Sequence, residues 1–352
     1  MEKNILEVRD LHTSFATPAG LVKAVDGVSF NLSPGKVLGI VGESGSGKSV
    51  TAYSLLQILT HPGKITGGSV KFDGEELVGA GEDKLREIRG NRISMIFQDP
   101  MTSLTPVYTV GNQLVEAILL HTDRDKAQSE ARAIEMLGLV GINDPEQRMK
   151  QYPFELSGGM RQRVMIAMAL ACEPDILIAD EPTTALDVTI QAQILELMTD
   201  LQHKFGMAII MITHDLGVIA SMCDEVIVMY AGKVCERGTA REIFYNPRHE
   251  YTRGLLKSIP NIDSETKEPL VPITGTPVDM LNLPEGCAFS PRCEKAMKIC
   301  LRQHPPEAFM NDEHASACWL NVKSGLETGA IEEDDEGNIT KINVEKAGGG
   351  RA

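Results

Sequence analysis

Residues 42–49 read Gly-Glu-Ser-Gly-Ser-Gly-Lys-Ser, a complete G-x-x-x-x-G-K-[ST] phosphate-binding loop. The apolar run 36–41 before it is typical of a buried strand, and residues 49–56 after it are compatible with a helix. The glycines let the backbone turn tightly and point its N–H groups at phosphate oxygens, and the helix start adds partial positive charge. The motif therefore predicts an α/β fold that binds a nucleoside triphosphate. The residues predicted to contact it are Gly42, Glu43, Ser44, Gly45, Ser46, Gly47, Lys48, Ser49 and Val50.

A second apolar run, residues 175–180, ends in a carboxylate, Asp180, and Glu181 follows it. An acid at the end of a buried strand in a chain with a phosphate loop suits a magnesium site. We expect Ser49 and Asp180 to hold Mg²⁺, Lys48 to reach the β- and γ-phosphates, and Glu181 to activate the attacking water as general base. The sequence thus predicts hydrolysis as well as binding.

Residues 156–163 read Leu-Ser-Gly-Gly-Met-Arg-Gln-Arg, and residues 182–187 read Pro-Thr-Thr-Ala-Leu-Asp. The first resembles the signature of ATP-binding cassette (ABC) proteins, and the second resembles the segment called the D-loop in that family. In this family the signature closes over nucleotide held by a second cassette. The resemblance therefore implies an ATP-driven dimer in which Ser157, Gly158 and Gly159 contact the partner's ATP, with Asp187 in the D-loop.

The same resemblance assigns further positions in chain order. Gln98 follows the strand-like run 93–97, which implies the family's Q-loop glutamine, a ligand of Mg²⁺ that senses the γ-phosphate. His214 follows the run 208–213, which implies the histidine that binds the γ-phosphate. Phe15 is the candidate aromatic for stacking on adenine, with a core residue of a β-strand as the alternative.

The rest of the chain predicts a soluble ATPase subunit with one cassette. Among its 352 residues there is no apolar run long enough to span a membrane and no signal peptide at Met1, and the net charge of −15 argues against a nucleic-acid partner. Residues 110–120 and 127–139 have helical apolar spacing, and residues 164–238 alternate between strand and helix patterns, which favours a mostly parallel sheet. Turns are predicted at 34–35, 67–68 and 73–74.

Residues 246–256 and 275–293 resemble the segment that follows the cassette in the peptide/nickel branch of ABC importers, in its oligopeptide/dipeptide group. The implied fold is a RecA-like, mostly parallel core with an antiparallel β region and a helical subdomain at about 99–160, in a nucleotide-binding domain of residues 1–247. A small cysteine-containing domain would follow at 248–322, and an acidic, Gly-rich tail at 323–352 is expected to be disordered.

Four of the seven cysteines, Cys287, Cys293, Cys300 and Cys318, are spaced C-x5-C-x6-C-x17-C. Paired C-x2-C units of a typical zinc site are absent, and disulfides are disfavoured in the cytosol. Four thiolates suit an iron–sulfur cluster, zinc and reduced structural thiols remain alternatives, and the resemblance implies a [4Fe–4S] cluster. Three others are expected to be small core residues: Cys172, Cys223 and Cys235.

The expected function is ATP hydrolysis that energises uptake of oligopeptides or dipeptides at the cytoplasmic face of the membrane. The expected partners are a second, paralogous cassette, two membrane permeases and, through the complex, an extracytoplasmic peptide-binding protein. The alternatives are an importer for nickel, glutathione or a sugar-linked peptide, and a soluble ABC ATPase that acts on ribosomes or DNA.

Overall fold

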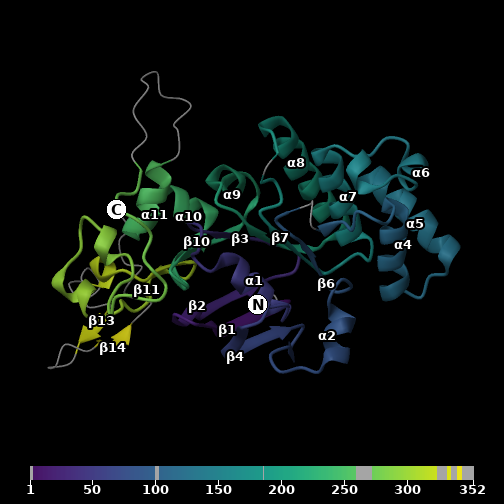
Figure 1. Cartoon of the computed structure of the whole chain (residues 1–352). Coiled ribbons are helices and arrows are strands. Elements are labelled where there is room, and N and C mark those ends of the chain that lie inside the picture. Colours follow the sequence, from purple (N-terminus) through teal and green to yellow (C-terminus); the bar gives the residue numbers. More distant parts are fainter. Residues whose placement is uncertain are drawn as a thin grey trace, which may run out of the picture.

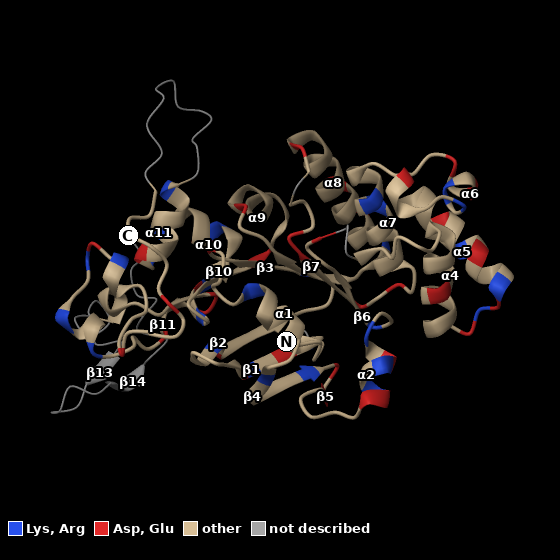
Figure 2. Cartoon of the chain, in the orientation of Figure 1, with Lys and Arg blue, Asp and Glu red and all other residues tan. Residues whose placement is uncertain are grey.

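The computed structural model describes residues 3–99, 103–184, 186–258 and 272–322, together with the backbone of two short strands at 331–333 and 339–342. Two sheets lie at its centre, a group of helices lies on one side of them, and the described residues 272–322 lie on the other (Figure 1). Asp and Glu occur together with Lys and Arg on helices such as α2 and α5 (Figure 2). In the described ranges, none of the helices combines the length and apolarity needed to cross a membrane.

The main sheet has eight strands in the order β11-β12-β10-β9-β3-β8-β7-β6. The run from β6 through β7, β8 and β3 to β9 is parallel, as the alternation of strands and helices predicted. Every residue of β3, β7 and β8 is buried, because helices and the second sheet cover both faces of a parallel sheet. The strands are β3 (Val37–Val41), β6 (Ile93–Ile96), β7 (Ile176–Asp180), β8 (Ala208–Ile212), β9 (Glu225–Tyr230), β10 (Lys233–Thr239), β11 (Ala308–Asn311) and β12 (His314–Ser316).

The second sheet is antiparallel, with the order β2-β1-β4-β5, as expected for the β region of the cassette. It consists of β1 (Leu6–Thr17), β2 (Gly20–Leu32), β4 (Gly63–Phe72) and β5 (Glu75–Glu76). The prediction of a turn at 67–68 is wrong, because both glycines lie inside β4. Gly68 has φ +94° and its Cα passes so close to β1 that a Cβ would lie 2.4 Å from the Asp10 carbonyl oxygen. These glycines mark an irregularity in strand pairing rather than a reversal of the chain.

Two apolar clusters cover the two faces of the main sheet. One cluster contains residues of the antiparallel sheet, of α1 and of α2. The other contains residues of the helical subdomain and of α8 to α11. Helices outside the helical subdomain are α1 (Lys48–Leu55), α2 (Glu82–Ile88), α8 (Val188–Phe205), α9 (Leu216–Met222), α10 (Ala240–Tyr245) and α11 (Glu250–Lys257).

The helical subdomain follows β6, where the sequence predicted it. Thr109 and Asp125 cap two of its helices, and Asp125 forms a capping box with Gln128. Ser157 caps α7, so the signature begins a helix as predicted. The helices are α4 (Val110–His121), α5 (Lys126–Leu139), α6 (Pro145–Arg148), a 3-10 helix (Pro153–Glu155) and α7 (Gly158–Leu170).

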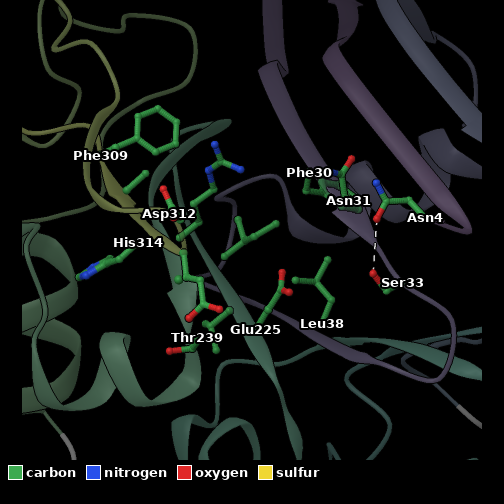
Figure 3. A pocket seen from close by; sticks show the side chains of 16 residues that line it. Asn4, Phe30, Asn31, Ser33, Leu38, Glu225, Thr239, Phe309, Asp312 and His314 are labelled. Carbon is green, nitrogen blue, oxygen red and sulfur yellow. Dashed lines mark hydrogen bonds between the residues drawn. The ribbon is translucent and has the colours of Figure 1, made fainter. Parts of the chain in front are cut away.

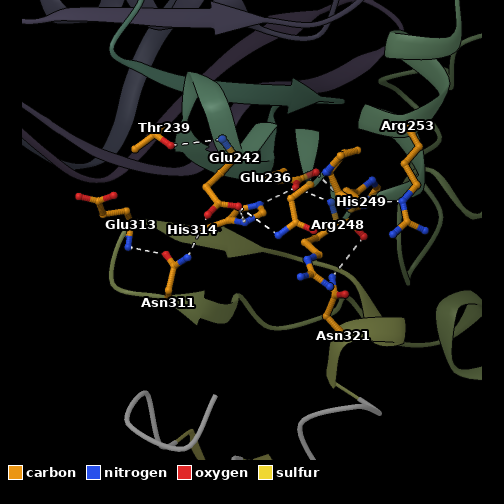
Figure 4. Close-up of polar contacts among 12 residues, drawn as sticks. Glu236, Thr239, Glu242, Arg248, His249, Arg253, Asn311, Glu313, His314 and Asn321 are labelled. Atoms are coloured by element: carbon orange, nitrogen blue, oxygen red, sulfur yellow. Dashed lines mark hydrogen bonds and ion pairs between the residues drawn. The ribbon is translucent and has the colours of Figure 1, made fainter. Parts of the chain in front are cut away.

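Residues 248–322, called here the C-terminal segment, attach to the cassette by strand pairing. β12 pairs with β10 through Glu236↔Ser316 and Arg237↔Ala315, so the segment extends the main sheet. At this joint the fully buried carboxylate of Glu236 lies 2.7 Å from His314 Nε2 and accepts the backbone N–H groups of Arg248 and His249 (Figure 4). Two short 3-10 helices, Ser290–Arg292 and Lys298–Leu301, complete the segment.

The tail predicted to be disordered, 323–352, lies outside the described residues except for two short strands. The backbones of β13 (Ile331–Glu333) and β14 (Ile339–Ile342) pair with each other in antiparallel fashion.

Candidate functional site

The phosphate loop connects β3 to α1, as the sequence predicted. Its glycines have backbone conformations that other residues adopt only with strain, with φ of +153° at Gly42, +78° at Gly45 and +102° at Gly47. A Cβ at Gly42 would lie 2.2 Å from the Met229 carbonyl oxygen, and one at Gly47 would lie 2.3 Å from that of Ala24. Two of these glycines are therefore required by close backbone contact as well as by the turn.

Lys48, Ser49 and Asp180 come together at the base of this loop. The buried Lys48 ammonium donates to the carbonyl oxygens of Gly42 (2.8 Å) and Glu43 (3.0 Å), and the Ser49 hydroxyl donates to Asp180 Oδ1 (2.9 Å). Burial lowers the pKa of Lys48, while the carboxylates of Glu181, Asp180 and Glu43 oppose that shift. The loop thus presents a cation, a hydroxyl and a carboxylate within a few ångströms.

Asp180 has the environment of a cation ligand. Its side chain is fully buried, and among the described residues its second oxygen, Oδ2, has no hydrogen-bond donor. Burial raises the pKa of Asp180, and the hydroxyls of Ser49 and Tyr53 oppose this shift. A bound divalent cation would satisfy the free oxygen and stabilise the charged carboxylate, so Asp180 and Ser49 fit a magnesium ion.

Glu181 joins the ends of three strands. Its carboxylate lies 3.2 Å from His214 Nδ1, accepts a hydrogen bond from Gln98 Nε2 at 2.8 Å, and accepts another from the Thr184 hydroxyl at 2.9 Å. Burial raises its pKa, but the contacts with His214 and Thr184 and the nearby charge of Lys48 outweigh burial, so the pKa of Glu181 is below its ordinary value. Glu181 is therefore a carboxylate at neutral pH, which is the form that can accept a proton from water.

The signature residues start α7. Ser157 and Gly158 are exposed, and the Ser157 hydroxyl accepts the Met160 N–H at 3.3 Å. Gly159 is half-buried, and a Cβ there would lie 3.1 Å from Ile190 on α8. Asp187 caps α8 by accepting the Ile190 N–H at 3.0 Å. The first turn of α7 thus presents backbone N–H groups at an exposed surface.

Phe15 lies in β1, where it pairs with Val22 and Gly63 on the two neighbouring strands. Its ring packs closely on Gly63, since a Cβ at Gly63 would lie 2.6 Å from it, and the side chain is half-buried. These contacts leave both readings of Phe15, as an adenine contact and as a strand residue, in place.

Several residues at the site were not predicted. Tyr53 lies one helical turn after Ser49 and interacts with Asp180, and burial raises the pKa of Tyr53 to about 12. The i, i+4 spacing on α1 could have identified it. Tyr251 and Arg292 also reach the phosphate loop, both at Glu43, but no sequence pattern connects residues so far apart.

The four cysteines of the C-terminal segment line one enclosed cavity of ≈ 20 Å³. Burial raises the pKa of Cys287 and of Cys318 to about 11 and also raises that of Cys293, so these thiols are protonated at neutral pH. Within the described ranges, His, Cys, Asp and Glu side chains form no group of three or more that could hold a metal ion as they stand. The thiols converge, but binding a metal would require the side chains to rearrange and lose protons. Of the remaining cysteines, Cys223 and Cys235 are buried in the core as predicted, and Cys172 is half-buried.

A separate cavity of ≈ 260 Å³ lies where β9 and β10 meet β11 and β12 (Figure 3). Glu225, Asp312 and Glu313 are among the residues that line it, and Arg237 beside them is paired with Glu307. It contains none of the predicted site residues.

Comparison with known families divides the chain in two. The family described as "ABC transporter" matches residues 25–184, which contain the phosphate loop, Gln98, the signature and Glu181. The family described as "Oligopeptide/dipeptide transporter, C-terminal region" matches residues 235–300, which contain three of the four cysteines.

Similar proteins match nearly the whole chain. It is 54% identical over 321 residues to the dipeptide transport ATP-binding protein DppD of Bacillus subtilis, with 91% of this chain and 95% of the relative covered. It is 55% identical over 322 residues to the oligopeptide transport ATP-binding protein OppD of Salmonella typhimurium, with 92% and 95% covered. Among solved structures, a dimeric post-hydrolysis state of the ATP-binding cassette MJ0796 with ADP and Pi matches with a TM-score of 0.61 at 27% identity, covering 67% of this chain and 99% of that one.

The geometry of the site and the names of the similar proteins both indicate an ATP-binding protein. A nucleotide hydrolase requires a phosphate loop, a carboxylate that can bind magnesium and a general base. Here Asp180 and the hydrogen-bonded Glu181 provide the two carboxylates at the strand ends. The chain is therefore an ATPase, and it belongs to the ABC transporter family, in the branch of the oligopeptide and dipeptide transport ATP-binding proteins.

Proposed function

We propose that this chain binds and hydrolyses ATP to energise uptake of oligopeptides or dipeptides through an ABC importer. The observation that carries the proposal is the assembly of Glu181 with Gln98 and His214 beside the phosphate loop, in a chain whose relatives are named for peptide transport. The chain would contact ATP and not the peptide, because cargo is recognised by other subunits.

In this function Lys48 and the loop N–H groups of residues 42–50 bind the phosphates. Ser49 and Asp180 would hold Mg²⁺, with Gln98 as a further ligand or sensor, and the bound ion would supply positive charge to the phosphates. Glu181 accepts a proton from the attacking water, and His214 contacts the γ-phosphate and orients Glu181. Phe15 stacks on adenine.

A second cassette would complete the nucleotide-binding site. Ser157, Gly158 and Gly159 lie at the start of α7 and would contact the γ-phosphate of ATP bound to the partner. Asp187, at the start of α8, would lie at the same interface. The partner would be a paralogous cassette. The solved structure of a dimeric cassette that is similar to this chain supports pairing of two cassettes. Closure around two ATP molecules would then drive the transport cycle, and hydrolysis would reset it.

The helical subdomain provides a surface for the membrane permeases. A groove of ≈ 730 Å³ lies between this subdomain and the end of β6, lined by Phe97, Gln98, Met165 and Met168 among others. Phe97 is 41% exposed there. An apolar groove beside Gln98 suits a short amphipathic helix from a permease, which would place the chain at the cytoplasmic face of the membrane.

Residues 1–247 would form the nucleotide-binding domain and residues 248–322 a small domain that holds a [4Fe–4S] cluster through Cys287, Cys293, Cys300 and Cys318. The convergence of these thiols on one cavity supports the proposal, and zinc is the alternative. The cluster would supply folding free energy to a segment with a small apolar cluster of its own. Anaerobically purified protein should contain about four irons per chain. Stoichiometric zinc without iron would show that the site binds zinc and not the cluster. Protein without metal would show that the four cysteines are ordinary reduced thiols.

An uptake assay tests the identity of the transported cargo. The complex of this cassette with its partner cassette, permeases and binding protein, reconstituted in vesicles, should accumulate a labelled di- or tripeptide when ATP is supplied, and Lys48→Ala should abolish accumulation. Uptake of nickel or glutathione without uptake of peptides would assign another cargo within the family. A chain that co-purifies with ribosomes or DNA and with no permease would contradict the transport function.

A further inference from the structure

The C-terminal segment contacts the phosphate loop through an ion pair. Both terminal nitrogens of Arg292 donate to the carboxylate of Glu43, with 3.0 Å between Nη2 and Oε1, although the residues are 249 positions apart in the chain. The Arg292 side chain is 4% exposed and that of Glu43 is 26% exposed. A bidentate pair this well shielded from water is strong and geometrically specific.

Arg292 is held in place independently of Glu43. Its Nε donates to the Thr274 carbonyl oxygen at 3.0 Å, and its guanidinium lies 5.9 Å from the ring centres of both Tyr230 and Phe289. Carbonyl and aromatic contacts of this kind fix the direction of the guanidinium. Arg292 is therefore aimed at the loop by the segment around it.

A second contact acts on the backbone of the same loop residue. The hydroxyl of Tyr251, which is fully buried, accepts the Glu43 N–H at 2.7 Å, and the Tyr251 ring packs on Tyr230 and Phe289. The side chain and the N–H of Glu43 are thus both bound by residues of the C-terminal segment.

The charge of Glu43 opposes nucleotide binding unless it is neutralised. Its carboxylate lies close enough to Lys48 to act on the ammonium, and the Glu43 carbonyl oxygen accepts a hydrogen bond from that ammonium. The phosphates of ATP would bind in this region, and two negative groups in a site of low dielectric repel strongly. Arg292 supplies the compensating positive charge.

We propose that Arg292 is a positioning residue for ATP binding: it neutralises and orients Glu43, so that the C-terminal segment forms part of the nucleotide site. The inference rests on ATP binding at the phosphate loop and does not depend on the peptide cargo or on a metal at the cysteines.

The test measures the equilibrium affinity of the full-length chain for Mg-ATP by calorimetry. The variants are Arg292→Met, Arg292→Lys, Glu43→Gln and the double variant Glu43→Gln/Arg292→Met. Arg237→Met is the matched control, because Arg237 also forms a bidentate pair between the cassette and the C-terminal segment, with Glu307, but does not contact the loop.

We expect Arg292→Met to weaken ATP binding about tenfold, since it leaves an uncompensated carboxylate beside the phosphates. Arg292→Lys should be intermediate, because it keeps the charge and loses the bidentate geometry. The double variant should bind ATP about as tightly as Glu43→Gln alone and more tightly than Arg292→Met, because without the Glu43 charge there is nothing for Arg292 to neutralise. A residue that only stabilised the fold would not be rescued by removing the Glu43 charge.

Three results would overturn the proposal: wild-type affinity in Arg292→Met, a double variant as weak as Arg292→Met alone, or an equal loss in the Arg237→Met control. Where Arg292→Met does not fold, Arg292→Lys and Glu43→Gln/Arg292→Lys give the same comparison. Loss of ATP binding in a Lys48→Ala control separates failure of this proposal from failure of the nucleotide site itself.

Discussion

Glu181 combines an uncommon backbone conformation with side-chain contacts from three other residues. Its φ is +49°, in the left-handed region that is unfavourable for residues other than glycine. The strain is held by the contacts to Gln98, Thr184 and His214, which fix the carboxylate before substrate binds. The His214 side chain is 63% exposed, so a phosphate group could approach its ring from the solvent.

Replacing Glu181 with Gln should stop hydrolysis and preserve ATP binding. The amide keeps the shape of the side chain but cannot accept a proton, and general base catalysis contributes roughly 10²–10⁴ in rate. In a complex whose partner cassette is inactive, ATPase turnover should fall by that factor, while nucleotide retention should persist or increase.

Glu87→Gln on α2, where the carboxylate is 73% exposed, is the control and should leave turnover unchanged. Wild-type turnover of Glu181→Gln in a complex whose partner cassette is inactive would remove Glu181 from the catalytic role.

At the scale of residues, the sequence predicts positions better than contacts. Asp180, Gln98 and His214 each follow an apolar strand, and parallel strands end at one edge of a sheet, so their proximity could be predicted. The hydrogen bonds to Glu181 depend on the positive φ and on Thr184, and no pattern in the sequence reveals these. The ion pair of Arg292 with Glu43 depends on how the last part of the chain folds back, so it too required the structure.

Among the structural elements, the joint between β10 and β12 depends on buried charge. Burial raises the pKa of Glu236, but the contact with His314 and the hydrogen bonds from two backbone N–H groups outweigh burial, so its pKa lies below the ordinary value. His314 Nδ1 also lies 3.4 Å from Glu242 on the other side of the ring. The joint is therefore most stable when Glu236 is charged.

Glu236→Gln should destabilise the chain by about 1–3 kcal/mol at neutral pH, because it removes the charge that His314 and the N–H groups bind. A carboxyl whose folded-state pKa is lowered contributes stability above its unfolded pKa of about 4.3, and loses it as pH falls through the folded pKa. The difference in unfolding free energy between wild type and Glu236→Gln should therefore be largest near pH 7 and shrink below about pH 4.

Glu307→Gln provides the comparison, because Glu307 pairs with Arg237 at the same joint but is 39% exposed. Exposed pairs contribute about 0–1 kcal/mol, so this change should be small at every pH. A Glu236→Gln penalty that stayed constant below pH 4 would contradict the assignment of the charge to Glu236.

Strands and helices of the cassette were predictable because their patterns are long and local. The runs before Gly42, Gln98, Glu181 and His214 all contain strands, and the predicted helices at 110–120 and 127–139 agree with α4 and α5. β11 and β12 were missed because they have four and three residues, too short for a periodic pattern. The turn expected at 67–68 failed because a pair of glycines serves equally for a turn and for close packing of two strands.

For the whole molecule, the proposed function assigns the exposed start of α7 to the nucleotide of a partner cassette, so one chain would contribute residues to two different sites. Ser157 and Gly158 are exposed, while Lys48 and Asp180 are buried at the phosphate loop. The isolated chain should therefore hydrolyse ATP slowly, and the partner cassette with the permeases should raise the rate.

The measurement is ATPase turnover against protein concentration, with the oligomeric state determined at each concentration. Gly158→Arg should leave ATP binding by the chain intact and reduce turnover of the complex, since it obstructs the partner's nucleotide. A confirmed monomer as active as the complex would contradict the shared site.

The strand pairing of β12 has a consequence for solubility. Without residues 248–322, the hydrogen-bonding groups of Glu236 and Arg237 would lie on an open sheet edge, next to the apolar residues of β9. Open edges of this kind add strands from other molecules and lead to aggregation. A cassette truncated after β10 should therefore form oligomers through this edge, so β11 and β12 protect the cassette from self-association.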